Sequence, residues 1–185
     1  RQLTGMQVNQ IPPNSRADFA ALLTEYENSL LFNADMPESM NELGLFYAGY
    51  GDLQRATQTL EAALDLSSAY LPVMLNLSDL YRAQDRDDLA EPLLDEATRL
   101  YPESADASHS LGLLYVRTFR LPESLELFQQ AAELAPGNPQ YVYVYAVALA
   151  ELDRVDEAIT VLTDARQRFP DDAQIRNALQ AYRNR

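Results

Sequence analysis

The sequence predicts an all-α solenoid, a stack of helix-turn-helix repeats. One pattern of large and small residues occurs four times at a fixed interval, and the copies begin at Leu43, Leu77, Leu111 and Tyr145. The third copy contains Leu111, Gly112, Tyr115, Ser124, Phe128, Ala131 and Pro136. Apolar residues within each copy recur at helical spacing, and 47% of the chain is hydrophobic. Because one unit of this size cannot bury its own apolar face, the copies are expected to stack around a continuous core.

Proline and turn residues divide the chain into seven predicted segments. These are a linker or strap (1–15), an N-terminal helix (16–36), four repeats (37–70, 71–104, 105–138 and 139–172) and a C-terminal capping helix (173–185). Pro37 and Pro139 lie at predicted helix starts, where a missing N–H costs nothing. Pro102, Pro136 and Pro170 lie past helix ends and block continuation. The N-terminal helix has no preceding partner in the pattern, so we expect it to close that end of the stack.

The run from Tyr141 to Tyr145 alternates tyrosine and valine, which locally favours a β-strand. The repeat register instead places this run in the first helix of the fourth repeat. Tertiary packing overrides propensities of a few tenths of a kcal/mol per residue, so we predict a helix from Tyr141 to Glu151.

Small residues recur where paired helices must approach closely. On the first helices they are Gly44, Ser78, Gly112 and Ala146, and on the second helices Ala56, Ala90, Ser124 and Ala158. From Pro37 to Asp172 the whole pattern resembles the tetratricopeptide repeat. That resemblance implies a right-handed superhelix whose inner surface comes from the first helices. It also implies a non-catalytic module that binds a protein or peptide.

Residues one step beyond the packed positions of each first helix are expected to face the inner surface. These candidate partner-binding residues are Asn41, Leu45, Leu75, Asp79, Arg82, His109, Leu113, Val116, Arg117, Tyr143 and Val147. An apolar row that packing does not require predicts a groove for an extended peptide or a helix. The alternative is that the N-terminal strap covers it. The row lacks the Lys, Arg and Asn set with which related repeats hold a terminal carboxylate. Arg82, His109 and Arg117 instead predict a preference for apolar peptides with an acidic residue.

Composition argues against several other function classes. The net charge is −14 and all 14 basic residues are Arg, so nucleic acid is a poor partner. There is no Cys, which removes thiolate catalysis and zinc–thiolate sites. No Ser-His-Asp set, metal-ligand cluster or phosphate loop is present, so we predict no enzyme activity, no cofactor and no metal. No apolar run approaches the ~20 residues that span a bilayer, so membrane insertion is not expected.

A second resemblance is narrower. The runs 76–82, 109–117 and 141–149 look like the C-terminal repeat segment of bacterial multihaem c-type cytochromes. Those proteins attach haem through Cys-x-x-Cys-His motifs, which this chain lacks. This resemblance implies an alternative function, a structural or docking domain of a larger exported cytochrome in the bacterial periplasm. The start at Arg1 suggests a mature product or an excised domain, and the oligomeric state stays open.

Overall fold

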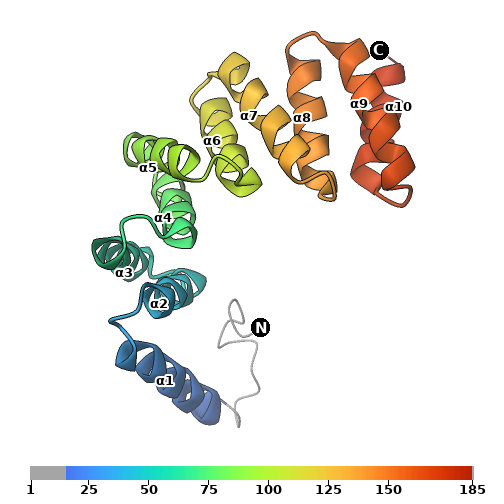
Figure 1. The fold of residues 1–185 in the computed structure, drawn as a ribbon. Coiled ribbons are helices and arrows are strands. Elements are labelled where there is room, and N and C mark those ends of the chain that lie inside the picture. Colours follow the sequence, from blue (N-terminus) through green and yellow to red (C-terminus); the bar gives the residue numbers. More distant parts are fainter. Residues whose placement is uncertain (1–15, 185) are drawn as a thin grey trace. The chain divides into compact units, whose positions relative to one another are not determined.

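A computed structural model describes the backbone of residues 16–184 and the side chains of residues 21–184. This part of the chain forms ten α-helices and contains no strand (Figure 1). The chain divides into two compact units, Arg1–Leu93 and Leu94–Arg185, and the division falls within α5 (Asp87–Leu100). The all-α prediction is confirmed. Residues 1–15, predicted to be a linker or strap, lie outside the described residues, and the ranges assigned to single repeats stay predictions.

The first unit contains four complete helices. They are α1 (Arg16–Phe32), α2 (Pro37–Gly49), α3 (Leu53–Leu66) and α4 (Leu71–Ala83). Pro37 occupies the first turn of α2, and the Asp52 side chain caps α3 by accepting a hydrogen bond from the backbone N–H of Arg55 at 3.0 Å. A Cβ at Gly44 would lie 2.5 Å from Cδ2 of Leu60, so a larger residue here would displace the buried Leu60 side chain.

The second unit contains five further helices. They are α6 (Ala105–Arg117), α7 (Leu121–Leu134), α8 (Pro139–Glu151), α9 (Val155–Arg168) and α10 (Ala173–Arg183). Ser104, Asn138 and Asp172 cap α6, α8 and α10 with their side-chain oxygens. Phe128 and Leu149 are fully buried in the core of this unit.

The strand-like run is helical, as the repeat register predicts. Tyr141 and Val142 are buried, while Tyr143, Val144 and Tyr145 pack partly against the core. The β-branched and aromatic side chains therefore gain burial on a helix, and that gain outweighs their local strand preference.

The turn after each first helix uses the same backbone conformation. Gly51, Asp85, Phe119 and Asp153 all have positive φ, between 57° and 79°, and they recur at the interval of the sequence repeat. Glycine and aspartate tolerate this left-handed region, whereas a bulky residue does not. Phe119 is therefore the exception among the four, and its side chain is 96% exposed.

A tyrosine–carboxylate bond also repeats along the chain. Tyr47 donates to Glu27 at 2.7 Å, and one repeat later Tyr81 donates to Glu61 at 2.9 Å. Each bond links the first helix of a repeat to the helix before it. Glu27 lies on α1 and Glu61 on α3, the second helix of its pair. By this register α1 takes the place of a second helix, in a repeat whose first helix is not among the described elements.

The terminal helices differ in polarity. Ile175, Leu179 and Tyr182 of α10 are buried, and its exposed residues are polar or alanine, as a capping helix requires. In α1, Leu22 is 58% exposed and Phe32 is 88% exposed. The predicted N-terminal helix is present, and its described exposed side carries these large apolar residues beside polar ones such as Glu25 and Asn28.

Candidate peptide-binding surface

The candidate residues of the second unit lie on its first helices. His109, Leu113 and Val116 are spaced at i, i+4 and i+7 on α6, so they share one helical face. Tyr143 and Val147 hold the first two of these register positions on α8. A hydrogen bond from the Tyr141 hydroxyl to Oδ1 of Asp106 joins α8 to α6.

This surface combines half-buried apolar side chains with an exposed cation. Leu113 and Tyr143 pack partly against the core of the second unit, and Val147 is also half-buried. Val116 is 42% exposed, and Arg117 beside it is exposed. The arrangement offers a shallow apolar contact and a guanidinium that can pair with a carboxylate.

His109 is packed between aromatic rings and does not stand free on the surface. Its ring centroid lies 4.6 Å from that of Tyr141 and 5.6 Å from that of Phe128. Burial, and then the hydrogen bond to Asp106, raise the pKa of Tyr141 to about 12. Tyr141 was missed by the sequence reasoning. The large side chain of Tyr141 could have marked this position as unusual, because the equivalent positions of the other repeats carry the smaller Ser39, Val73 and Ala107.

The candidate residues of the first unit form a more polar set on α2 and α4. Asn76 donates a hydrogen bond from Nδ2 to Oδ1 of Asn41 at 2.8 Å, which links the two helices. Arg82 donates to Asp79 at 2.9 Å on the same helix. Burial raises the pKa of Asp79, and the Arg82 guanidinium opposes that rise.

Two apolar side chains flank this polar set. Leu45 is 41% exposed and Leu75 is half-buried. Asn76 is not one of the candidate partner-binding residues named from the sequence, although it joins this polar set. Its hydrogen bond to Asn41 places the two side-chain amides next to each other, one on α2 and one on α4.

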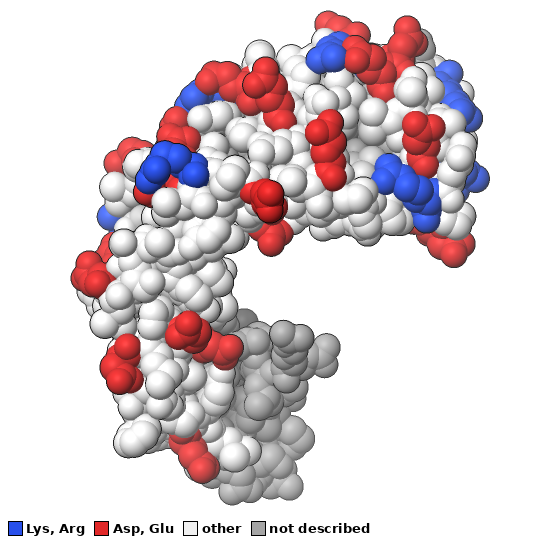
Figure 2. Space-filling view, viewed as in Figure 1, with Lys and Arg blue, Asp and Glu red and all other residues white. Residues whose placement is uncertain are grey.

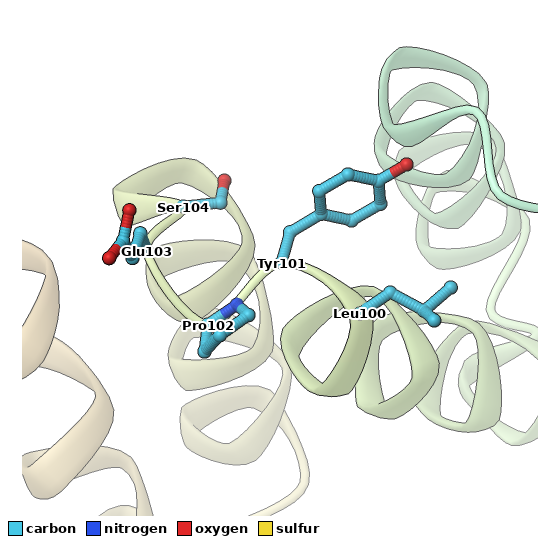
Figure 3. A pocket seen from close by; sticks show the side chains of 5 residues that line it. All are labelled: Leu100, Tyr101, Pro102, Glu103 and Ser104. Carbon is cyan, nitrogen blue, oxygen red and sulfur yellow. The ribbon is translucent and has the colours of Figure 1, made fainter.

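Other types of site are not evident in the described residues. Within residues 21–184 no group of three His, Cys, Asp or Glu side chains is arranged to hold a metal ion. None of the described helices is long and apolar enough to cross a membrane. A pocket of about 420 Å³ lies at the α5–α6 loop, where Leu100 and Tyr101 project from one side and Glu103 and Ser104 from the other (Figure 3). The candidate residues lie elsewhere.

Solved structures with the same fold cover most of the chain. TTC0263 from Thermus thermophilus shares 22% identity with a TM-score of 0.69, over 95% of this chain and 94% of that one. YrrB, a TPR protein described as having an unusual peptide-binding site, shares 21% identity with a TM-score of 0.67, over 90% and 86%. MamA from Desulfovibrio magneticus RS-1 shares 23% identity with a TM-score of 0.65, over 75% and 78%.

Curated relatives match only part of the chain. Photosystem I assembly protein Ycf3 of Prochlorococcus marinus (strain MIT 9313) is 32% identical over 101 residues, which are 53% of this chain and 58% of that protein. Human Protein O-mannosyl-transferase TMTC1 is 33% identical over 85 residues, which are 46% of this chain and 10% of that protein. This chain thus spans less than two thirds of either relative.

Family profiles described as "Tetratricopeptide repeat" match residues 75–139 and 118–182. The two matches overlap and together cover more than half of the chain. They agree with the helical pairs and with the repeated solenoid fold of the structural neighbours. This chain is a tetratricopeptide repeat protein.

Proposed function

We propose that this chain is a non-catalytic interaction module and that the α6–α8 face binds an extended peptide carrying an acidic residue. The observation that carries the proposal is the apolar strip of Leu113, Val116, Tyr143 and Val147 beside the exposed Arg117. Tetratricopeptide repeats serve in general as protein-interaction scaffolds. YrrB, which shares the fold, is described as having a peptide-binding site, and that description supports the proposal.

The expected affinity is modest because the strip is small. Full burial of an exposed aliphatic side chain contributes ~1.5–3 kcal/mol, and Leu113 and Val147 gain less because they are already half-buried. Association and ordering costs of ~4–15 kcal/mol offset much of that gain. Binding is therefore expected near the micromolar range, with Arg117 favouring a carboxylate on the peptide.

Substitution of the strip tests this function. Peptides selected on the wild-type protein by display are measured by calorimetry against Leu113→Asp and Arg117→Glu. We expect Leu113→Asp to weaken binding at least about tenfold, because each ~1.4 kcal/mol is a factor of ten. Arg117→Glu is expected to weaken acidic peptides more than neutral ones. Leu134→Asp, on an exposed leucine of α7, is the matched control.

Unchanged affinity in Leu113→Asp would move binding off this face. The docking-domain alternative, with the convex surface or the ends in use, would then take its place. The relation to multihaem cytochromes and the periplasmic location belong to that alternative and stay predictions. The expected lack of nucleic-acid binding rests on the net charge of −14 alone.

A further inference from the structure

The outer side of α1 corresponds to a surface that is covered in a complete repeat. Leu22, Tyr26 and Ser29 hold the same repeat positions as Ala56, Leu60 and Ala63, one repeat earlier in the chain. Those three residues of α3 are fully buried, and Leu60 lies against Gly44 of α2, the first helix of the same repeat. Since α1 takes the place of a second helix, its Leu22, Tyr26 and Ser29 face, here called the α1 face, is where a first helix would pack.

The α1 face is exposed. Leu22 is 58% exposed and Tyr26 is 42% exposed. Tyr26 is fixed on its other side, because its ring lies 5.6 Å from that of Phe46 and its hydroxyl donates to Oε2 of Glu42 at 3.1 Å. The face is therefore a preformed surface, held in place by α2.

The surroundings of the α1 face are predominantly acidic, although the Arg55 guanidinium lies 3.6 Å from Oε1 of Glu27 on α1. Residues 17–54 contain seven Asp or Glu and no Arg or Lys. Figure 2 shows acidic and no basic side chains over α1 and α2 on the side in view. Glu25, on the exposed side of α1, lies one residue before Tyr26. A helix that packs here meets carboxylates on its flanks, so a basic helix is favoured.

We propose that the α1 face binds an amphipathic helix of a partner protein, with small apolar residues along one stripe and Arg or Lys on its flanks. Small residues are required because Leu22 stands where complete repeats have an alanine or a serine, such as Ala56 or Ser124. The basic flanks pair with the carboxylates around the face. This helix-in-groove contact takes the position that a first helix has in a complete repeat, and it is separate from the α6–α8 face.

A second copy of this chain is a poorer occupant. The end that continues a stack is α10, and its exposed Arg176, Gln180 and Arg183 are polar. Packing them on Leu22 would bury polar groups against an apolar side chain without hydrogen-bond partners.

Three synthetic peptides of about 18 residues, long enough for about 27 Å of helix, test the proposal by fluorescence anisotropy with the full chain. The first has an Ala/Leu stripe with Arg flanks. The second keeps the stripe with Glu flanks, and the third has the composition of the first with the stripe broken. We expect the first to bind near the micromolar range and the others at least about tenfold more weakly.

Substitutions in the chain test whether the Arg-flanked peptide binds to the α1 face. Leu22→Asp is expected to weaken the Arg-flanked peptide at least about tenfold, since a buried Leu contributes ~1.5–3 kcal/mol. Phe119→Asp is the matched control, because it removes an exposed apolar side chain and adds the same charge elsewhere. Leu113→Asp is also expected to leave this affinity unchanged, which separates the α1 face from the α6–α8 face.

Four results would overturn the proposal. They are no binding of the Arg-flanked peptide up to about 1 mM, equal binding of the Glu-flanked peptide, self-association that Leu22→Asp abolishes, and binding to neutral phosphatidylcholine vesicles that Leu22→Asp abolishes. The last two would assign the face to a second copy or to a membrane surface.

Discussion

Phe119 holds a backbone conformation that bulky side chains disfavour. Its φ is 62°, and its side chain makes almost no contact that would offset the cost. The left-handed region costs an ordinary residue ~1–2 kcal/mol, and Asp tolerates it better. Asp occupies the equivalent positions 85 and 153. The turn therefore depends on the backbone of the repeat and not on the side chain of Phe119.

Phe119→Asp is expected to stabilise the fold by about 1 kcal/mol, which raises Tm by roughly 2–4 °C in a chain of this size. Thermal unfolding followed by circular dichroism measures it. Phe119→Val is the control and is expected to lower Tm, because β-branching worsens the fit to positive φ. A fall in Tm for Phe119→Asp would mean that the aromatic ring stabilises the turn.

At the scale of elements, α6 and α7 pair through one glycine. A Cβ at Gly112 would lie 2.6 Å from Cε1 of Phe128, whose ring is buried and packs against His109. Complete repeats with a larger residue at this position, Ser78 or Ala146, have a leucine in place of that phenylalanine. The phenylalanine thus requires the glycine, whereas a glycine also occurs opposite a leucine, as in Gly44 and Leu60.

Gly112→Ala is expected to destabilise the chain by ~1–3 kcal/mol through overpacking, despite the better helix propensity of alanine. Adding Phe128→Leu should restore part of that loss, because the pair then matches the fourth repeat. Chemical denaturation of the two single variants and the double variant gives the coupling energy. Strictly additive losses would show that the two residues do not pack as described.

At the scale of the molecule, tyrosines paired with carboxylates recur in both units. Burial, and then the partner carboxylate, raise the pKa of Tyr26 and Tyr47, and raise those of Tyr81 and Tyr141 to about 12. In the unfolded chain these groups titrate near 10. The folded state thus holds their protons more tightly, so this contribution is complete below pH 10 and is lost as pH rises toward 12.

Because the chain has neither Lys nor Cys, tyrosine is the main side chain that titrates in this window. We expect Tm to fall between pH 10 and 12. The Tyr81→Phe/Tyr141→Phe variant should have a lower Tm at pH 8, since it lacks two hydrogen bonds. Its Tm should then fall less than that of the wild type as the pH rises from 10 to 12. Parallel curves for the two proteins would contradict this assignment.

The sequence by itself determined the helical elements of this protein. The fixed repeat period, the prolines at helix starts and the small residues at close contacts act locally or recur in each unit. That is why α8 could be predicted against its own strand preference. A repeat pattern indicates which positions pack against a neighbouring helix, and this information is enough to predict the fold class.

Only the tertiary structure showed which partners the individual side chains at those positions contact. The contact of His109 with Tyr141, the Asn76–Asn41 bond and the Tyr141–Asp106 bond all join residues on neighbouring first helices, about one repeat apart in sequence. Likewise, the exposure of Leu22 and Tyr26 on α1 is known only from the structure, because their repeat positions alone predict burial. Side-chain partners across helices depend on the whole stack, because burial and hydrogen bonding are set by neighbours distant in sequence.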